Sequence, residues 1–165
     1  DEVYKNHALI VHAVASLKKI NIDFYKKMKV VFTLDKGSEI YHLVKKNDLL
    51  DCFVFTGPIS QRQVFIFYQN SNVLIFPSLI ESFGLPLIEA ASFGMKILVS
   101  DLPYAHETLD GYPCVEYLPV NCVEIWSKTM IDKFLDSSSG GCSFKVMNDS
   151  WSEFFRFLFN LNRKS

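Results

Sequence analysis

Short apolar runs alternate along the chain with longer stretches in which apolar residues recur every three or four positions. The short runs are typical of strands buried on both faces of a parallel sheet, and the longer stretches of amphipathic helices. The predicted strands cover residues 29–33, 52–55, 73–76, 97–100 and 114–118. The predicted helices cover residues 9–17, 38–46, 60–68, 84–93, 121–135 and 150–162. This alternation predicts an α/β fold with a doubly wound, mainly parallel sheet.

The stretch from residue 73 to residue 111 has the clearest local order. Pro77 ends an apolar strand, and the loop after it leads into a helix that begins near Gly84 and Pro86. Proline suits a first helical turn because its missing N–H breaks no intrahelical bond there. Gly94 suits the left-handed position that follows a helix end. These signals predict a βαβ unit with its loops at the carboxyl ends of the strands, where open α/β sheets bind ligands.

Two carboxylates frame this unit. Glu81 lies in the loop before the helix, and Glu89 lies about one turn inside it. Between them, the N–H groups of residues 82–85 surround the positive end of the helix, which suits phosphate. Carboxylates beside a phosphate can accept hydrogen bonds from hydroxyls, so the pattern suggests a ligand with both phosphate and sugar hydroxyls. From the residues alone, a solvated Glu81 and a Glu89 on an ordinary helix face remain equally open.

The composition limits the classes of function. A chain of 165 residues is expected to form one domain, and 49% hydrophobic residues allow a sizeable core. The net charge of −1 argues against a nucleic-acid-binding protein, which usually carries a basic face. No apolar run reaches membrane-spanning length, and no signal peptide is visible. The cysteines lack metal-ligand spacing, so we expect reduced thiols at Cys52, Cys114, Cys122 and Cys142.

The segment from residue 77 to residue 101 resembles the E-x7-E signature of retaining glycosyltransferases with the GT-B fold, the family called group 1 or family 4. A looser likeness covers nearly the whole chain. The positions in register are Pro77-Ser78, Glu81, Phe83-Gly84-Leu85-Pro86, Glu89-Ala90 and Gly94. The resemblance implies a Rossmann-like sheet forming the C-terminal half of a GT-B fold. Residues 1–165 would then be one nucleotide-sugar-binding domain, with the N-terminal acceptor domain and the first strand absent.

The resemblance also implies roles for the two carboxylates and the loop. Glu89 would hold the ribose of the donor, and Glu81 would contact the donor sugar as a catalytic residue. The loop amides would bind diphosphate and sugar; they belong to Ser82, Phe83, Gly84 and Leu85.

Three further positions are assigned through the resemblance. Lys5 would bind the donor diphosphate and assist catalysis, although an exposed lysine is the common alternative. Gly57 and Ile59 would make backbone contacts to the nucleobase, although an ordinary strand–helix turn explains them equally well. For His106, which follows the last strand of the βαβ unit, we prefer a structural or exposed role.

The predicted helix at residues 150–162 is apolar nearly all round, which requires partners on several sides. In GT-B enzymes the last helix crosses back onto the acceptor-binding half. We therefore expect Phe157 and Phe159 to form part of an interface, the alternative being that they fill this domain's own core.

The predicted function is the donor-binding half of a retaining hexosyl- or N-acetylhexosaminyl-type glycosyltransferase. It would transfer a sugar from a UDP- or GDP-sugar to an acceptor hydroxyl in bacterial polysaccharide or glycolipid synthesis. The acceptor would be lipid-linked or a glycan, and the location cytoplasmic, at the inner face of the membrane. No cofactor or metal is implied, since the chain has no Asp-x-Asp motif and no histidine cluster. The fragment alone is expected to be inactive.

Two other functions were weighed. One is a non-catalytic module that binds a nucleotide sugar or a protein partner. The other is a dinucleotide-dependent oxidoreductase, which we discount because no G-x-G-x-x-G motif follows a strand.

Overall fold

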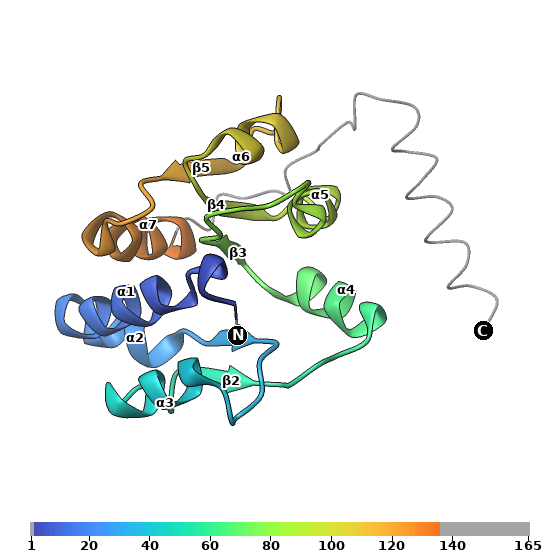
Figure 1. Ribbon diagram of the computed structural model, residues 1–165. Helices are drawn as coiled ribbons and strands as arrows, with labels where there is room; N and C mark the ends of the chain where they lie inside the picture. Colours follow the sequence, from blue (N-terminus) through green and yellow to red (C-terminus); the bar gives the residue numbers. More distant parts are fainter. Residues whose placement is uncertain (1, 136–165) are drawn as a thin grey trace.

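The computed structural model describes residues 2–135, and Figure 1 shows their arrangement. The helices and strands follow one another along the chain in the order η1 (Val3–Lys5), α1 (His7–Ile20), α2 (Ile22–Lys27), β1 (Val30–Phe32), α3 (Glu39–Lys46), β2 (Phe53–Phe55), α4 (Gln61–Asn70), β3 (Val73–Phe76), α5 (Leu85–Ser92), β4 (Lys96–Ser100), α6 (Pro103–Thr108), β5 (Val115–Leu118) and α7 (Val123–Leu135). The predicted crossing helix at residues 150–162, with Phe157 and Phe159, lies outside the described residues.

All strand pairs in the described residues are parallel, which confirms the predicted α/β fold. β1 pairs with β2, and a separate set runs in the order β3-β4-β5. Rossmann-type order places a further strand between β1 and β3. The described residues contain no pairing between β1 and β3, and the strand expected there stays a prediction.

Helices cover both faces of the sheet (Figure 1). Alternate residues of β4 point to opposite faces, because side chains alternate along a strand. Leu98 packs in one core cluster with residues of α1, α2, α3 and α7, and Ile97 and Val99 pack in a second with residues of α4, α5 and α6. The first cluster contains residues of β1 and β2 as well as β4 and β5, so one apolar core joins both parts of the sheet.

Local signals set several helix ends as predicted. Ser60 begins α4 with a capping box, in which its side chain and that of Gln63 satisfy each other's backbone N–H. Ser38 caps α3 by accepting a hydrogen bond from the Tyr41 N–H. Gly94 takes the left-handed conformation (φ 69°) after α5, as expected of a residue following a helix end.

The structure differs from the sequence prediction in several places, including the unpredicted short helices η1 and α6. The short helix α2 was not predicted; Asn21 begins it by accepting a hydrogen bond from the Phe24 N–H at 3.0 Å. The prediction of reduced thiols is wrong at Cys114, which is disulfide-bonded. Cys52 and Cys122 are free thiols, and Cys142 lies outside the described residues. No helix within residues 2–135 is long and apolar enough to cross a membrane.

Candidate functional site

The N-terminal turn and the loop after β3 meet through an ion pair. Lys5 Nζ lies 2.6 Å from Glu81 Oε1, although 76 positions separate the two residues. The Glu81 side chain is 13% exposed and that of Lys5 31% exposed, so the pair is partly shielded from water. Asn6 turns the chain between η1 and α1 in a left-handed conformation (φ 54°). Two of the predicted catalytic residues therefore lie in direct contact.

Backbone contacts fix this meeting of two segments. The Leu79 N–H donates to the Tyr4 carbonyl at 2.7 Å, and the buried Ser78 hydroxyl lies 3.4 Å from the same carbonyl. The Ser78 hydroxyl is also 3.1 Å from the Ile80 carbonyl, inside its own loop. The beginning of the loop is thus docked onto the residue that precedes Lys5.

Helix α6 holds the same loop from another side. The Tyr104 hydroxyl donates to the Ser78 carbonyl at 2.7 Å, and the Thr108 hydroxyl donates to the Phe83 carbonyl at 2.9 Å. Burial, followed by the nearby charge of Glu81, raises the pKa of Tyr104, so its hydroxyl remains a donor at neutral pH. Neither residue was predicted from the sequence, because nothing in their local pattern indicates a contact with the loop.

The loop ends at Gly84, where the backbone is left-handed (φ 66°). A Cβ atom there would also lie only 3.1 Å from Leu87 Cδ1, so both conformation and space favour glycine. α5 begins at the next residue, and its first turn contains Pro86, which has no N–H, while the Leu87 N–H already donates to the Gly84 carbonyl at 2.8 Å. Phe83 and Leu85 are 44% and 49% exposed, so this helix end is open to a ligand. The arrangement fits an anion site.

Glu89, half-buried in α5, is held by two side chains of α4. The Tyr68 hydroxyl lies 3.2 Å from Glu89 Oε2, and Gln61 Nε2 lies 3.4 Å from Glu89 Oε1. Sequence analysis identified Glu89 but neither partner. Gln61 and Tyr68 are seven positions apart on one helix, a spacing of two turns that places them on the same face, but this gave no reason to single them out.

The loop expected to meet a nucleobase has structural roles of its own. Gly57 is left-handed (φ 68°), and a Cβ atom there would lie 2.9 Å from Asp35 Oδ1. Its N–H donates to the Leu34 carbonyl at 3.1 Å. Ile59 is half-buried just before α4, so this loop leads directly into Gln61. Contact of Gly57 and Ile59 with a base stays a prediction.

His106 has structural partners. Its Nε2 lies 2.7 Å from Asp101 Oδ1, and its ring stacks on Tyr117 with centroids 3.9 Å apart. This agrees with the preferred structural interpretation. Within residues 2–135, no group of three His, Cys, Asp or Glu side chains is placed to hold a metal ion.

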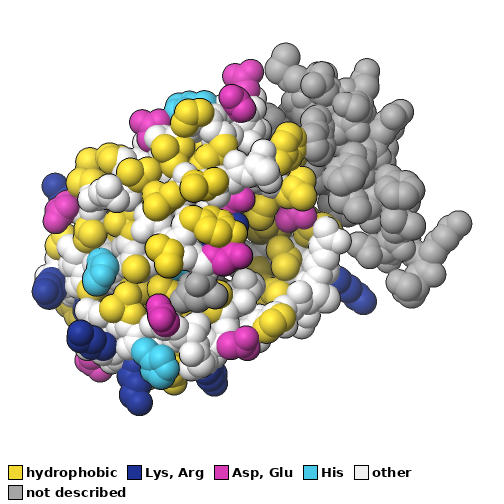
Figure 2. Space-filling view, viewed as in Figure 1, with side chains coloured by type: hydrophobic (Ala, Val, Ile, Leu, Met, Phe, Trp, Pro, Cys, Tyr) yellow, Lys and Arg dark blue, Asp and Glu magenta, His cyan; other side chains and the backbone are white. Residues whose placement is uncertain are grey.

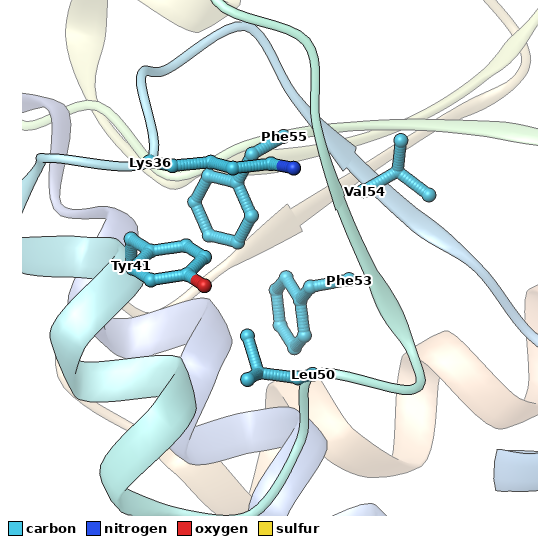
Figure 3. Close-up of a pocket in the computed structure, with 6 residues that line it drawn as sticks. All are labelled: Lys36, Tyr41, Leu50, Phe53, Val54 and Phe55. Carbon is cyan, nitrogen blue, oxygen red and sulfur yellow. The ribbon is translucent and has the colours of Figure 1, made fainter.

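The surface also has features outside this cluster. Figure 2 shows a face on which many apolar side chains reach the surface, with carboxylates scattered among them. A separate hollow of about 330 Å³ lies beside β2, lined by Lys36, Tyr41, Leu50, Phe53, Val54 and Phe55. Figure 3 shows the Lys36 chain across its aromatic lining. None of the predicted donor-site residues lines this hollow.

The fold and the cluster at the start of α5 define a class of protein. The sequence model of the family described as glycosyl transferases group 1 matches residues 2–112. The chain belongs to this family, as the E-x7-E resemblance predicted.

Two curated relatives give the family context. The chain is 31% identical over 99 residues to O-antigen chain mannosyltransferase RfbU of Salmonella typhimurium, covering 60% of this chain and 28% of the relative. It is 24% identical over 100 residues to D-inositol 3-phosphate glycosyltransferase of Paenarthrobacter aurescens, covering 59% of this chain and 24% of the relative. The matched segment therefore spans about a quarter of each of these proteins.

Solved structures share the fold. A glycosyltransferase from Rickettsia africae superposes with a TM-score of 0.66 at 19% identity, covering 79% of this chain and 34% of that one. Sucrose-phosphate synthase from Thermosynechococcus elongatus gives a TM-score of 0.67 at 17% identity, covering 97% of this chain and 44% of that one. The pneumococcal O-GlcNAc transferase GtfA, solved with UDP and GlcNAc, gives a TM-score of 0.57 at 22% identity, covering 78% of this chain and 25% of that one. These neighbours confirm the GT-B type of fold.

Proposed function

We propose that this chain is the donor-binding half of a retaining glycosyltransferase that moves a sugar from a nucleoside diphosphate sugar to an acceptor hydroxyl. The observation that carries the proposal is the convergence of Lys5 and Glu81 beside the N-terminus of α5. A cation and the positive N-terminal end of a helix suit a diphosphate, and an adjacent carboxylate suits sugar hydroxyls. Membership of the group 1 family supports the same reaction class.

Each residue has a defined part in this reaction. When the bond between the anomeric carbon and the diphosphate oxygen breaks, negative charge develops on the leaving oxygen. Lys5 and the amides of residues 82–85 stabilise that charge, which is electrostatic catalysis by donors already in place. Glu81 accepts hydrogen bonds from the sugar, and Glu89 accepts them from the ribose. The retaining outcome rests on the resemblance of the two-glutamate signature.

The Lys5–Glu81 pair has a consequence for donor binding. Lys5 Nζ, already 2.6 Å from Glu81 Oε1, can contact a phosphate oxygen only by sharing or exchanging this partner. An ammonium group carries three N–H donors, so Lys5 can donate to Glu81 and to a phosphate oxygen at the same time. Glu81 thereby keeps Lys5 near the loop before the donor arrives.

The relatives support a substrate class. The relative from Salmonella is named an O-antigen chain mannosyltransferase, which supports hexosyl transfer in bacterial polysaccharide synthesis. The donor would be a UDP- or GDP-sugar, and the acceptor a glycan or lipid-linked sugar at the inner face of the membrane. An acceptor-binding half elsewhere in the full-length protein would complete the site, because GT-B chemistry takes place between two halves.

Calorimetric titration of the full-length protein with UDP, GDP and NAD tests the proposal. Binding of UDP or GDP, with loss of affinity on Glu89→Ala, is the expected result. Binding of NAD alone, or of none of the three, would overturn the proposal. Binding of UDP-sugar or GDP-sugar without any turnover, in the presence or absence of glycan acceptors, would favour the non-catalytic module.

A further inference from the structure

The carboxylate of Glu89 is held on one side by α4. The Tyr68 hydroxyl donates to Oε2 and the Gln61 amide donates to Oε1, at 3.2 and 3.4 Å. Each oxygen of the Glu89 carboxylate therefore accepts one hydrogen bond from α4. An ionised carboxylate offers about four lone-pair sites, so about two remain for hydroxyls arriving from elsewhere.

Tyr68 is a rigid member of this arrangement. The residue is 8% exposed, and its ring packs against Phe65 and Phe93 with centroid separations of 6.4 and 5.8 Å. The ring therefore has little freedom to move, and the direction of its hydroxyl is fixed by the core. Burial, followed by the charge of Glu89, raises the pKa of Tyr68 and keeps its hydroxyl protonated at neutral pH.

Gln61 connects the same carboxylate to the loop after β2. It is the first residue of α4, directly after Ser60, whose capping box with Gln63 fixes the start of the helix. The Gln61 side chain therefore extends from a well-defined helix end toward Glu89. Both hydrogen bonds are longer than the usual length. Each restrains the orientation of the carboxylate and leaves it able to accept further hydrogen bonds.

We propose that Tyr68, assisted by Gln61, is a positioning residue that turns the free lone pairs of Glu89 toward the two ribose hydroxyls of the donor. This inference rests on the proposed function. Tyr68 is buried in the core of α4 and α5 and acts through Glu89. Its removal should therefore weaken recognition of the ribose rather than of the diphosphate, which lies with Lys5 and the loop amides.

The test compares ribose with deoxyribose. UDP and GDP, and the 2′-deoxy form of each, are titrated calorimetrically into the full-length protein carrying Tyr68→Phe. The expected result is an affinity for the ribonucleotide about three- to fivefold lower, in the range of one weak hydrogen bond. Affinity for the 2′-deoxy form should change less, so the preference for the ribonucleotide shrinks. In a Glu89→Ala background, Tyr68→Phe should have no further effect on affinity.

Tyr112→Phe is the matched control. Tyr112 is buried in the same core cluster, and its hydroxyl donates to the Met95 carbonyl rather than to Glu89. Its loss should lower the melting temperature while leaving the preference for ribose unchanged. If Tyr68→Phe fails to fold, the exposed Gln61→Ala carries the test, with the same direction and a smaller effect.

The outcomes separate the two proposals. If the wild-type protein binds no nucleoside diphosphate, the proposed function fails and this inference fails with it. If Glu89→Ala weakens binding but Tyr68→Phe leaves the preference for ribose intact, only the positioning role is wrong. If Tyr68→Phe weakened binding of the ribonucleotide and of its 2′-deoxy form equally, the role of Tyr68 would likewise be purely structural.

Discussion

Lys5 Nζ and Glu81 Oε1 lie 2.6 Å apart, so a residue before the first long helix and a residue after β3 form one partly buried ion pair. The Leu79–Tyr4 backbone hydrogen bond holds the two segments beside each other, and the Tyr104–Ser78 hydrogen bond ties the loop after β3 to α6. Both partners were assigned to the donor site from the resemblance, and the structure places them in contact. In the proposed donor site, this pair sets the charge that a diphosphate meets at the start of α5.

Substitution of the two glutamates should have different effects on nucleotide affinity. Glu89→Ala removes the proposed acceptor for ribose hydroxyls, and a charge-assisted hydrogen bond is worth roughly 1.5–3 kcal/mol. Affinity for UDP or GDP should therefore fall about 10- to 100-fold, measured by calorimetric titration. Glu81→Ala should leave that affinity equal or higher, because Lys5 loses its competing partner. Glu116→Ala, which removes a carboxylate paired with Lys133, is the control and should change nothing. Equal, unchanged affinities for both site variants would mean that neither carboxylate holds the nucleotide.

Lys5→Ala should weaken binding of the diphosphate. The same range of about 10- to 100-fold is expected, because a charge-assisted contact with phosphate is lost. The dependence of affinity on salt concentration should also become shallower, since one screened charge pair has been removed. Lys18→Ala is the matched control: Lys18 pairs with the exposed Asp48 at 3.3 Å and has no part in the loop. A Lys5→Ala protein that binds as tightly as the wild type would remove Lys5 from the site.

Gly84→Ala should disturb both stability and binding. Alanine in a left-handed conformation costs about 1–2 kcal/mol, and its Cβ would crowd Leu87 at 3.1 Å. Chemical denaturation should show a loss of that order, and UDP or GDP affinity should fall as the loop amides shift. Gly37→Ala is the control, because a Cβ there meets nothing within 4 Å. Equal effects of the two substitutions would contradict the need for glycine at the start of α5.

Removal of metal should not affect nucleotide binding. The proposed contacts to the diphosphate come from Lys5 and backbone N–H groups, which need no divalent ion. Titration of UDP or GDP in excess EDTA should therefore give the same affinity as titration in buffer. A large loss that is restored by added Mg²⁺ or Mn²⁺ would show that a metal bridges the phosphates.

Local pattern was enough to predict much of the fold. β3 and the ends of α5 follow from an apolar run, Pro86 and Gly94, whose effects act within a few residues. Ser60 and Gln63 predicted the start of α4 for the same reason, since a capping box is closed within one turn. Glu81 and Glu89 were also selected as candidate site residues from sequence, through their spacing and a family resemblance, and their roles stay predictions. By contrast, the short helix α2 and the disulfide bonding of Cys114 were missed.

The sequence by itself therefore determined the five strands and most of the helices, and it singled out the two carboxylates as site candidates, because these depend on neighbours along the chain. Only the tertiary structure decided which side chains surround those carboxylates. Lys5 reaches Glu81 across 76 positions, and Tyr68 reaches Glu89 across 21, through packing of helices onto a shared sheet. Contacts at such separations depend on how the whole core packs, and no local period or capping signal encodes them.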